Sequence, residues 1–403
     1  MSNLERYLNE NHQNPENLAE DFSTKFGVNV KNEGDLYLFK YGIISAKWEP
    51  ETLECRGSIL KFSDNDGWEF KSRPFDKFFN QHEGHCPVFD PKVFNEDLLE
   101  QSCLATKADG TCIQLWHDGA KWRASTLGTI TPLMAHESNL TFDQLFFKTV
   151  GNIIWDDLVP ELTYIFELCT EENRIVTQYP ADHAVLLGVR DRVWGDYYSL
   201  NGDLEDMIEY GPFREANVVL PQLIYPTQIG LRSLEDVKQF IEESAKTDKY
   251  GKYPEGFVLY DLNCFHPLAK MKNSQYVSLH SFGGGDIAHS KNQIIDAVFL
   301  GFVDDIYDVL SDRLREFADK IKQEAESLLE STLLTAENLQ DNCPFESRKE
   351  YAAFIQQNAD KRVHSFFFKN AEEFMTKEIR DVSPKFRGWL NENYKKFDWK
   401  NEE

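Results

Sequence analysis

The sequence predicts an α+β fold in which a domain of antiparallel sheets is followed by an all-α domain. Short β-rich segments separated by turn residues dominate the chain up to about residue 280. From about residue 291 the apolar residues recur at the spacing of amphipathic helices, and no further strand pattern occurs. The expected domains are therefore residues 1–285 and 286–403.

The first domain begins with a mixed, mainly helical segment over residues 1–35. Asp118-Gly119 is typical of a tight turn, so the segments on either side of it should form a hairpin. An amphipathic helix is expected at 234–245. The β-rich segments predict strands at 36–41, 54–62, 111–116, 122–125, 164–168, 184–189, 255–260 and 268–272.

The second domain contains two long helical patterns. Apolar residues from Ile294 to Leu310 recur every three or four positions, and a second pattern runs from about Glu350 to Ile379. Pro384 should end that helix, because proline lacks the amide hydrogen that a helix interior uses. A short last helix is expected around Trp389.

Charge and composition restrict the possible functions. With 68 acidic and 43 basic residues in 403, the net charge of −25 argues against a general nucleic-acid coat. A focused basic cleft remains possible in an acidic protein. No apolar run is long enough to cross a bilayer, and the N-terminus lacks a signal-peptide pattern. We therefore expect no membrane partner and a cytoplasmic location, or the host cytoplasm for a viral protein.

The cysteines and histidines do not form a familiar metal motif. The seven cysteines contain no Cys-x-x-Cys pair, which favours reduced thiols. His82-Glu83-Gly84-His85-Cys86 is compatible with a metal site, but no partner cluster lies at the spacing of a zinc site. A surface loop before Pro87 is the preferred interpretation.

The segment with the most specific chemistry is Lys107-Ala108-Asp109-Gly110. A lysine amine in such a setting can attack phosphorus and carry a nucleotide as a covalent phosphoramidate. The alternative is an ordinary strand and turn with a solvated lysine.

Other charged residues in the β-rich region are compatible with phosphate chemistry. Lys270 and Lys272 lie two apart on an expected strand, so both side chains should leave the same face and could bind a phosphate. The alternative is a solvated edge strand protected by lysines. Glu167 and Glu255 need a metal, a hydroxyl donor or a local salt bridge if they are buried. Arg56 and Lys77 supply two further cations. The alternative for each is a purely structural role.

Taken in order, these motifs resemble the covalent nucleotidyltransferases, and most closely the T4 RNA ligase 1 family of ATP-dependent RNA ligases. The resemblance covers about residues 36–280. It rests on Glu54-Cys55-Arg56-Gly57, Ser72-Arg73-Pro74, Lys77-Phe78-Phe79-Asn80, Lys107-Ala108-Asp109-Gly110, Phe166-Glu167, Asn173-Arg174-Ile175-Val176, Glu255-Gly256-Phe257, Lys270-Met271-Lys272 and Tyr276-Val277-Ser278-Leu279-His280. It implies an antiparallel-sheet nucleotidyltransferase (ATP-grasp-like ligase) domain followed by an α-helical specificity domain.

The resemblance also implies a three-step reaction with ATP and Mg²⁺, or Mn²⁺. Lys107 would take AMP from ATP, AMP would pass to an RNA 5′-phosphate, and an RNA 3′-hydroxyl would then displace it. Lys107 is accordingly the implied catalytic residue. The implied ATP-binding residues are Phe39 (or Tyr41), Arg56, Lys77, Asp109, Gly110, Glu167, Lys270 and Lys272, and the implied metal ligands are Glu255 and Asp304 (or Asp305).

Leu127 is a departure from the family pattern, because it stands where the family can carry a lysine after the motif hairpin. One phosphate contact is therefore expected to be missing or replaced.

The resemblance further implies a partner RNA. Single-stranded RNA or a nicked tRNA anticodon loop is the expected substrate of a monomeric enzyme. No Gly-x-x-x-x-Gly-Lys-Ser/Thr loop is present, so a separate end-healing kinase/phosphatase is expected. The alternatives are a capping-type guanylyltransferase and an inactive, ligase-derived RNA-binding protein.

Overall fold

The chain forms two compact units in a computed structural model. The first comprises residues 1–14, 31–40 and 48–287, and the second comprises residues 15–30, 41–47 and 288–403. The structure describes residues 2–42, 46–135, 138–247, 249, 254–274, 276–277, 291–300, 303, 307, 312–342, 345, 347–376, 382–397 and 399.

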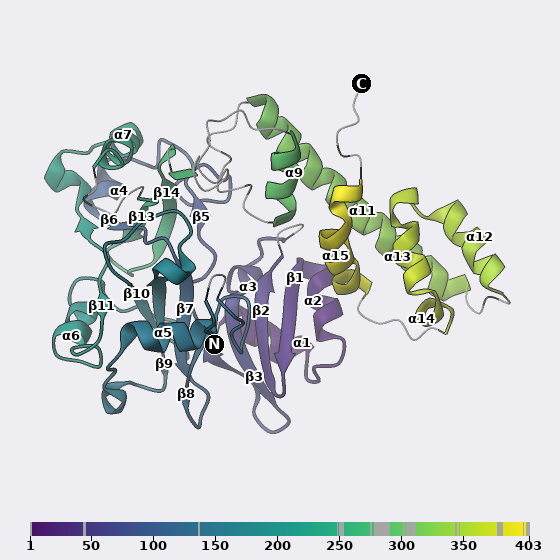
Figure 1. Ribbon diagram of the computed structural model, residues 1–403, viewed down its shortest axis with the longest axis horizontal. Coiled ribbons are helices and arrows are strands. Elements are labelled where there is room, and N and C mark those ends of the chain that lie inside the picture. The colour runs from purple at the N-terminus through teal and green to yellow at the C-terminus, as the bar shows by residue number, and fades with distance from the viewer. Residues whose placement is uncertain are drawn as a thin grey trace. The chain divides into compact units, whose positions relative to one another are not determined.

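The first unit is built on three sheets, which Figure 1 shows in purple and teal. Most strand pairs are antiparallel, and the parallel pairs are β10 with β11 and β14 with β5. The four-stranded sheet has the order β1 (Val28–Glu33), β2 (Leu36–Tyr41), β3 (Arg56–Ser63), β4 (Gly67–Ser72). One five-stranded sheet has the order β11 (Val218–Val219), β10 (His183–Asp191), β9 (Leu162–Cys169), β7 (Thr111–His117), β8 (Trp122–Thr126). The other has the order β12 (Leu223–Ile224), β6 (Ser102–Thr106), β13 (Gly256–Asp261), β14 (Pro267–Lys272), β5 (Phe79–Asn80).

A shared apolar core lies between the two five-stranded sheets. Ala105 and Val258 of one sheet belong to the same buried cluster as Ile113, Phe166 and Leu186 of the other. Full burial of each large apolar side chain contributes about 1.5–3 kcal/mol, so this core holds the two sheets together. Other helices of the unit are α1 (Asn3–Asn11), α3 (Pro50–Leu53), α4 (Glu96–Glu100), α5 (Phe142–Val150), α6 (Asp203–Glu209) and α7 (Leu234–Ser244).

The α+β prediction is confirmed, and every strand predicted from the sequence is present with ends within two residues of those expected. The helix expected at 234–245 is α7, which begins with a Ser233 side chain that accepts a hydrogen bond from the Asp236 amide. The segment from His82 to Cys86 lies in turns after β5.

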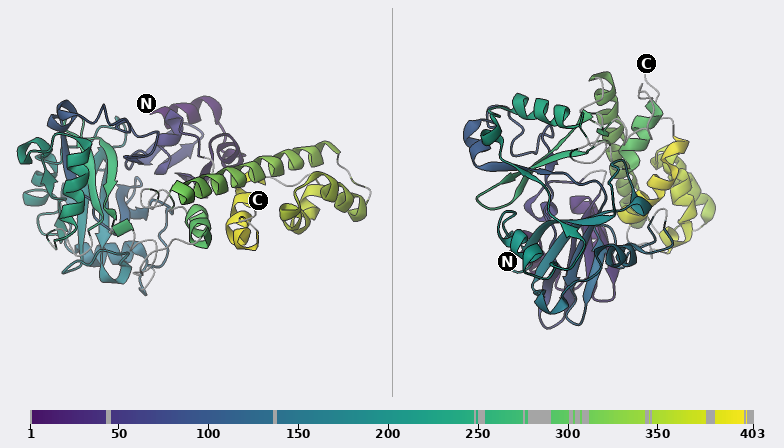
Figure 2. Two further views of the ribbon diagram at one scale, coloured as in Figure 1. Left: turned by 90° about the horizontal axis from the view of Figure 1, so that it is seen from above. Right: turned by 60° about the vertical axis from the view of Figure 1, so that its left-hand side comes forward.

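The second unit is helical, and its longest element is α11 (Asp312–Asn342), which the sequence patterns did not single out. Figure 2 shows α11 as the extended helix of this unit. Helices α9 (Lys291–Leu300) and α15 (Val382–Asn393) both pack on it. The remaining α-helices in the described part of this unit are α2 (Leu18–Phe26), α12 (Arg348–Asn358), α13 (His364–Lys369) and α14 (Ala371–Met375).

Two sequence expectations for this region differ from the structure. The segment expected as one helix from about Glu350 is divided among α12, α13 and α14, with a 3₁₀ turn at Lys361–Val363. Pro384 lies in the first turn of α15 and does not end a helix. A proline is tolerated there because amides of the first turn have no partner within the helix.

Helix α2 belongs to the helical unit although it lies near the N-terminus. Ser23 shares a 2.6 Å hydrogen bond with Ser383 of α15, and Arg387 of the same helix donates to the Ser23 hydroxyl. The buried side chains of Phe22 and Phe26 add an apolar face to α2. Removal of residues 291–403 would therefore remove α15, on which α2 packs.

Among the residues that the structure describes, no helix is long and apolar enough to cross a membrane.

Candidate functional site

The pairing of three adjacent strands brings the principal charged side chains together. Thr106 at the end of β6 pairs with Phe257 of β13, and the next amide, that of Lys107, donates to the Gly256 carbonyl at 2.9 Å. On the other edge of β13, Gly256 pairs with Lys272 of β14. Lys107, Glu255 and Lys272 therefore lie side by side although they are far apart in the sequence.

The Glu255 carboxylate bridges the two lysines. Its Oε2 lies 2.6 Å from the Nζ of Lys107, and its Oε1 lies 2.9 Å from the Nζ of Lys272. The side chain is only 4% exposed. Burial opposes ionisation, but the two ammonium groups outweigh it and hold the pKa of Glu255 below its ordinary value. Glu255 is thus a buried, charged group with both oxygens engaged.

Glu167 lies on β9, directly across from Cys112 of β7. Its Oε1 accepts a hydrogen bond from the Gly110 amide at 3.1 Å. The pKa of Glu167 is raised to about 7, chiefly by burial and also by the nearby carboxylates of Glu255 and Asp109, against the opposing effect of Lys107. Glu167 therefore titrates near neutrality in the free protein.

We expect Glu167→Gln to stabilise the free protein at pH 8 by on the order of 2 kcal/mol. Below the ordinary pKa of 4.5 the carboxyl is protonated in both the folded and unfolded states, so the variant should gain nothing there. As the pH rises from about 4.5 to about 7, the unfolded state loses its proton first and the wild type loses stability. Urea unfolding from pH 4 to 8 would measure the difference in unfolding free energy.

The control for this prediction is Glu161→Gln, because Glu161 is an exposed carboxylate outside the site. That variant should unfold like the wild type at every pH. A Glu167→Gln gain that did not vary with pH would contradict the assignment of this titration to Glu167.

Asp109 points into the protein interior and organises the backbone around the lysine. Its Oδ2 accepts hydrogen bonds from the amides of Val176 and Thr177 at 2.9 and 2.7 Å, and its Oδ1 accepts one from the Tyr276 hydroxyl at 2.6 Å. The residue is 4% exposed. Asp109 therefore fixes the loop and Tyr276, and its carboxylate does not line the cavity described next.

A cavity of about 230 Å³ opens beside Lys107, between the two five-stranded sheets. The guanidinium of Arg56 and the ammonium of Lys270 lie 5.3 and 5.0 Å from the ring centroid of Phe78. Among the described residues, the buried Nη1 atom of Arg56 has no hydrogen-bond partner, which is typical of a cation that awaits an anion. The cavity is lined by Arg56, Phe75, Phe78, Ala105, Thr106, Lys107, Ala108, Gly110, Cys112, Glu167, Leu187, Pro221, Val258, Tyr260 and Lys270.

The structure gathers most of the residues that the sequence singled out. The cavity lining includes Arg56, Lys107, Gly110, Glu167 and Lys270. Glu255 and Lys272 adjoin this cavity through their ion pairs around Lys107. The site therefore combines a lysine amine, several further cations and two carboxylates around a partly apolar space.

Two residues of the sequence prediction, Lys77 and Phe39, do not line the cavity. The Lys77 amine lies 4.7 Å from the ring centroid of Phe79 and 3.9 Å from a Glu83 oxygen, and Lys77 does not line the cavity. Phe39 is fully buried and packs edge-on against Trp68, with 6.1 Å between the ring centroids. Asp304 lies outside the described residues.

The structure adds residues to which the sequence assigned no role. Phe78 and Tyr260 contribute aromatic surface to the cavity, and Leu187 and Pro221 contribute aliphatic surface. Phe78 belongs to the Lys77-Phe78-Phe79-Asn80 motif, but the local sequence does not show that Arg56 and Lys270 lie beside its ring.

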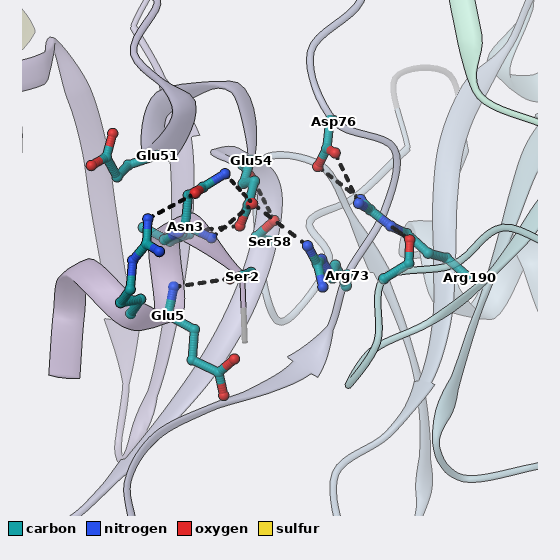
Figure 3. A network of polar contacts seen from close by, with 12 residues as sticks. Ser2, Asn3, Glu5, Glu51, Glu54, Ser58, Arg73, Asp76 and Arg190 are labelled. Carbon is teal, nitrogen blue, oxygen red and sulfur yellow. Dashed lines mark hydrogen bonds and ion pairs between the residues drawn. The ribbon is translucent and has the colours of Figure 1, made fainter. Parts of the chain in front are cut away.

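A buried polar network anchors the segment that begins with β3, as Figure 3 shows. Glu54 accepts hydrogen bonds from the amides of Asn3 and Leu4 at the start of α1. Its Oε1 also lies 3.5 Å from the Arg73 guanidinium. Because Glu54 stands two residues before Arg56, this network restrains the backbone from which Arg56 reaches the cavity.

A second part of the network holds the chain near Lys77 (Figure 3). Arg190 of β10 donates to both oxygens of Asp76 at 2.7 and 2.8 Å, and it also donates to the Pro74 carbonyl. A bidentate pair of this kind gives directional as well as electrostatic stabilisation. The β4–β5 connection is thereby fixed to the sheet that carries Glu167.

The chain is similar in sequence to known RNA ligases. The chain is 27% identical to an RNA ligase of Rhodothermus phage RM378, and the match covers 88% of this chain and 89% of the relative. It is 28% identical to a putative bifunctional polynucleotide kinase/RNA ligase of Autographa californica nuclear polyhedrosis virus, over 64% of this chain and 35% of that protein. A solved archaeal ATP-dependent RNA ligase aligns with 84% of each chain covered, at 14% identity and a TM-score of 0.42.

The RNA ligase family model of the T4 type 1 class matches residues 54–276, which span the strands and loops that build the cavity. This match covers just over half of the 403 residues, and the chain therefore belongs to the T4 type 1 family of RNA ligases.

Proposed function

We propose that this RNA ligase uses ATP and works through an AMP adduct on Lys107. The observation that carries the proposal is the convergence of the Lys107 amine with Arg56, Lys270 and Lys272 around one cavity. A single amine among several cations suits attack on a phosphate that bears negative charge. The apolar walls of the cavity suit a purine base.

The proposed first step forms a bond between the Lys107 Nζ and the α-phosphorus of ATP and breaks the bond to pyrophosphate. Because an amine attacks only through a free lone pair, the ammonium of this ion pair has to lose a proton first. Glu255, at 2.6 Å, is the carboxylate in position to accept that proton. AMP then passes to an RNA 5′-phosphate, and attack by an RNA 3′-hydroxyl releases it.

The proposed roles of the surrounding residues follow from their positions. Lys270 and Arg56 stabilise the phosphate charge, and Lys272 holds Glu255 in place through its ion pair. Glu167 and the Gly110 backbone form the polar end of the cavity and suit the ribose hydroxyls. Asp109 acts indirectly, by holding the loop around Lys107.

Magnesium, or manganese, fits this site mainly through the nucleotide. No group of three His, Cys, Asp or Glu side chains in the described part of the chain is arranged to hold a metal ion. The Glu255 oxygens already pair with lysines, so a bound ion would draw most of its ligands from phosphate oxygens and water, as Mg²⁺ commonly does. The ion would offset the triphosphate charge and orient the leaving pyrophosphate.

The test is labelling of the full chain with α-labelled ATP or GTP. A covalent adduct that forms with ATP, is released by pyrophosphate and passes to 5′-phosphorylated RNA supports the proposal. An adduct with GTP alone would favour a capping-type guanylyltransferase. No adduct with either nucleotide would favour an inactive, ligase-derived RNA-binding protein.

We propose single-stranded RNA, or a nicked tRNA anticodon loop, as the substrate, and residues 286–403 as the module that selects it. We propose that a separate kinase/phosphatase heals damaged ends; one relative is named as a putative bifunctional polynucleotide kinase/RNA ligase, and the match covers 35% of it. We also propose that the enzyme works as a monomer in the cytoplasm, or in the host cytoplasm if it is viral.

A further inference from the structure

The loop after the β7–β8 hairpin brings no cation to the site. Leu127 packs against Gly57, and a Cβ atom added to Gly57 would lie 2.8 Å from the Leu127 Cα. Gly57 has a φ of +87°, a conformation that favours glycine, so this close packing depends on its missing side chain. The loop therefore lies over the residue next to Arg56 with an aliphatic side chain where the family can carry a lysine.

Two lysines from other strands approach this loop instead. The Lys40 Nζ lies 3.5 Å from the position that a Cβ of Gly128 would take. The Lys31 Nζ donates to the Gly128 carbonyl at 2.9 Å. The loop that lacks a lysine of its own is therefore flanked by two.

Lys40 and Arg56 also face each other across the β2–β3 ladder. They are direct partners in the antiparallel register, so their side chains leave the same face of the sheet. Like charges in this arrangement repel each other. Lys40 is exposed as a residue, but neighbouring atoms displace water from its ammonium, and together with Lys31 and Arg56 they lower its pKa. Among the described residues, no carboxylate forms an ion pair with either Lys40 or Arg56.

We propose that Lys40 is a second phosphate-binding residue, which acts with Arg56 on the outer phosphates of ATP and on the pyrophosphate that leaves. It would supply the charge that Leu127 does not. An anion between Lys40 and Arg56 would relieve their repulsion, and the unpartnered Nη1 of Arg56 would gain an acceptor. This inference rests on the proposed function, because it requires ATP as the nucleotide.

The test compares Lys40→Gln and Lys40→Arg in the full chain. Loss of a charge-assisted hydrogen bond costs about 1.5–3 kcal/mol, so Lys40→Gln should raise the KM for ATP in adduct formation by roughly ten-fold or more. Inhibition by added pyrophosphate should weaken to a similar extent. Lys40→Arg keeps the charge and should stay within about three-fold of the wild type.

A second arm supplies pre-adenylylated RNA, whose sealing needs no triphosphate. Lys40→Gln should seal it within about two-fold of the wild-type rate. The control is Lys61→Gln in the same sheet, where Lys61 pairs with Asp35 at the surface, and it should change neither reaction.

Two results would overturn the role of Lys40: an unchanged KM for ATP, or an equal loss in both arms, which would assign the residue to RNA phosphate or to the fold. If wild-type protein formed no adduct with ATP, the proposed function itself would fail, and the two failures are therefore distinguishable.

Discussion

Lys107→Ala should form no covalent adduct with AMP and should seal no 5′-phosphorylated RNA. The variant lacks the amine whose Nζ lies beside Glu255 at the cavity, and water cannot hold AMP in its place. Adduct formation with α-labelled ATP, followed under denaturing conditions, gives the measurement. The expected loss is complete within the detection limit, and for covalent catalysts that commonly exceeds about 10³-fold.

The same variant should still seal pre-adenylylated RNA, because the last step uses the remaining cations and no lysine nucleophile. The fold should survive, since Glu255 keeps its 2.9 Å pair with Lys272. Lys121→Ala, at an exposed hairpin turn, is the control and should be labelled normally. Covalent AMP on the Lys107→Ala protein would show that another residue is the nucleophile.

Gly256→Ala should destabilise the protein by roughly 3–5 kcal/mol and remove activity. Gly256 has a φ of +137°, which L side chains rarely adopt, and an added Cβ would lie 2.2 Å from the Met271 carbonyl oxygen. That contact would force β13 away from β14. Glu255 directly precedes β13, and β14 carries Lys270 and Lys272, so the site would lose its geometry. Urea unfolding at a single pH measures the change in unfolding free energy.

Two other glycines separate the steric effect from the backbone strain. Gly84→Ala has open space and no positive φ, so it should be neutral within about 0.5 kcal/mol. Gly34 has a φ of +66° in open space, and Gly34→Ala should cost about 1 kcal/mol. If Gly256→Ala unfolded no more easily than Gly34→Ala, the close approach to Met271 would not matter for stability.

The sequence predicted the parts of the fold that depend on local pattern. Alternating and β-rich segments marked the strands, because side-chain period and turn residues are properties of neighbouring positions. The same reasoning predicted that Lys270 and Lys272 share a face of one strand. The order of the motifs indicated the family, and the family resemblance in turn implied functional roles for Lys107 and Glu255.

The parts that the sequence did not predict depend on register and packing between distant segments. Only the pairing of β6 with β13 and β14 shows that Glu255 bridges Lys107 and Lys272. Phe39 is buried because its face of β2 packs against Trp68. The sequence of residues 36–41 alone does not show which face of the strand is buried.

The sequence pattern did not predict helix α11 for a different reason. Charged residues interrupt its apolar stripe. The helix is stabilised by packing against α9 and α15 in addition to its own helix propensity. The grouping of α2 with the helical unit likewise depends on contacts with residues more than 300 positions away.

The bridge made by Glu255 has a consequence for the resting enzyme. A protonated amine has no lone pair to offer, so it does not add to carbonyl compounds, isocyanate or other stray electrophiles in the cell. By holding the Lys107 Nζ in an ion pair at 2.6 Å until a nucleotide arrives, Glu255 would shield the nucleophilic atom of the protein from chemical damage.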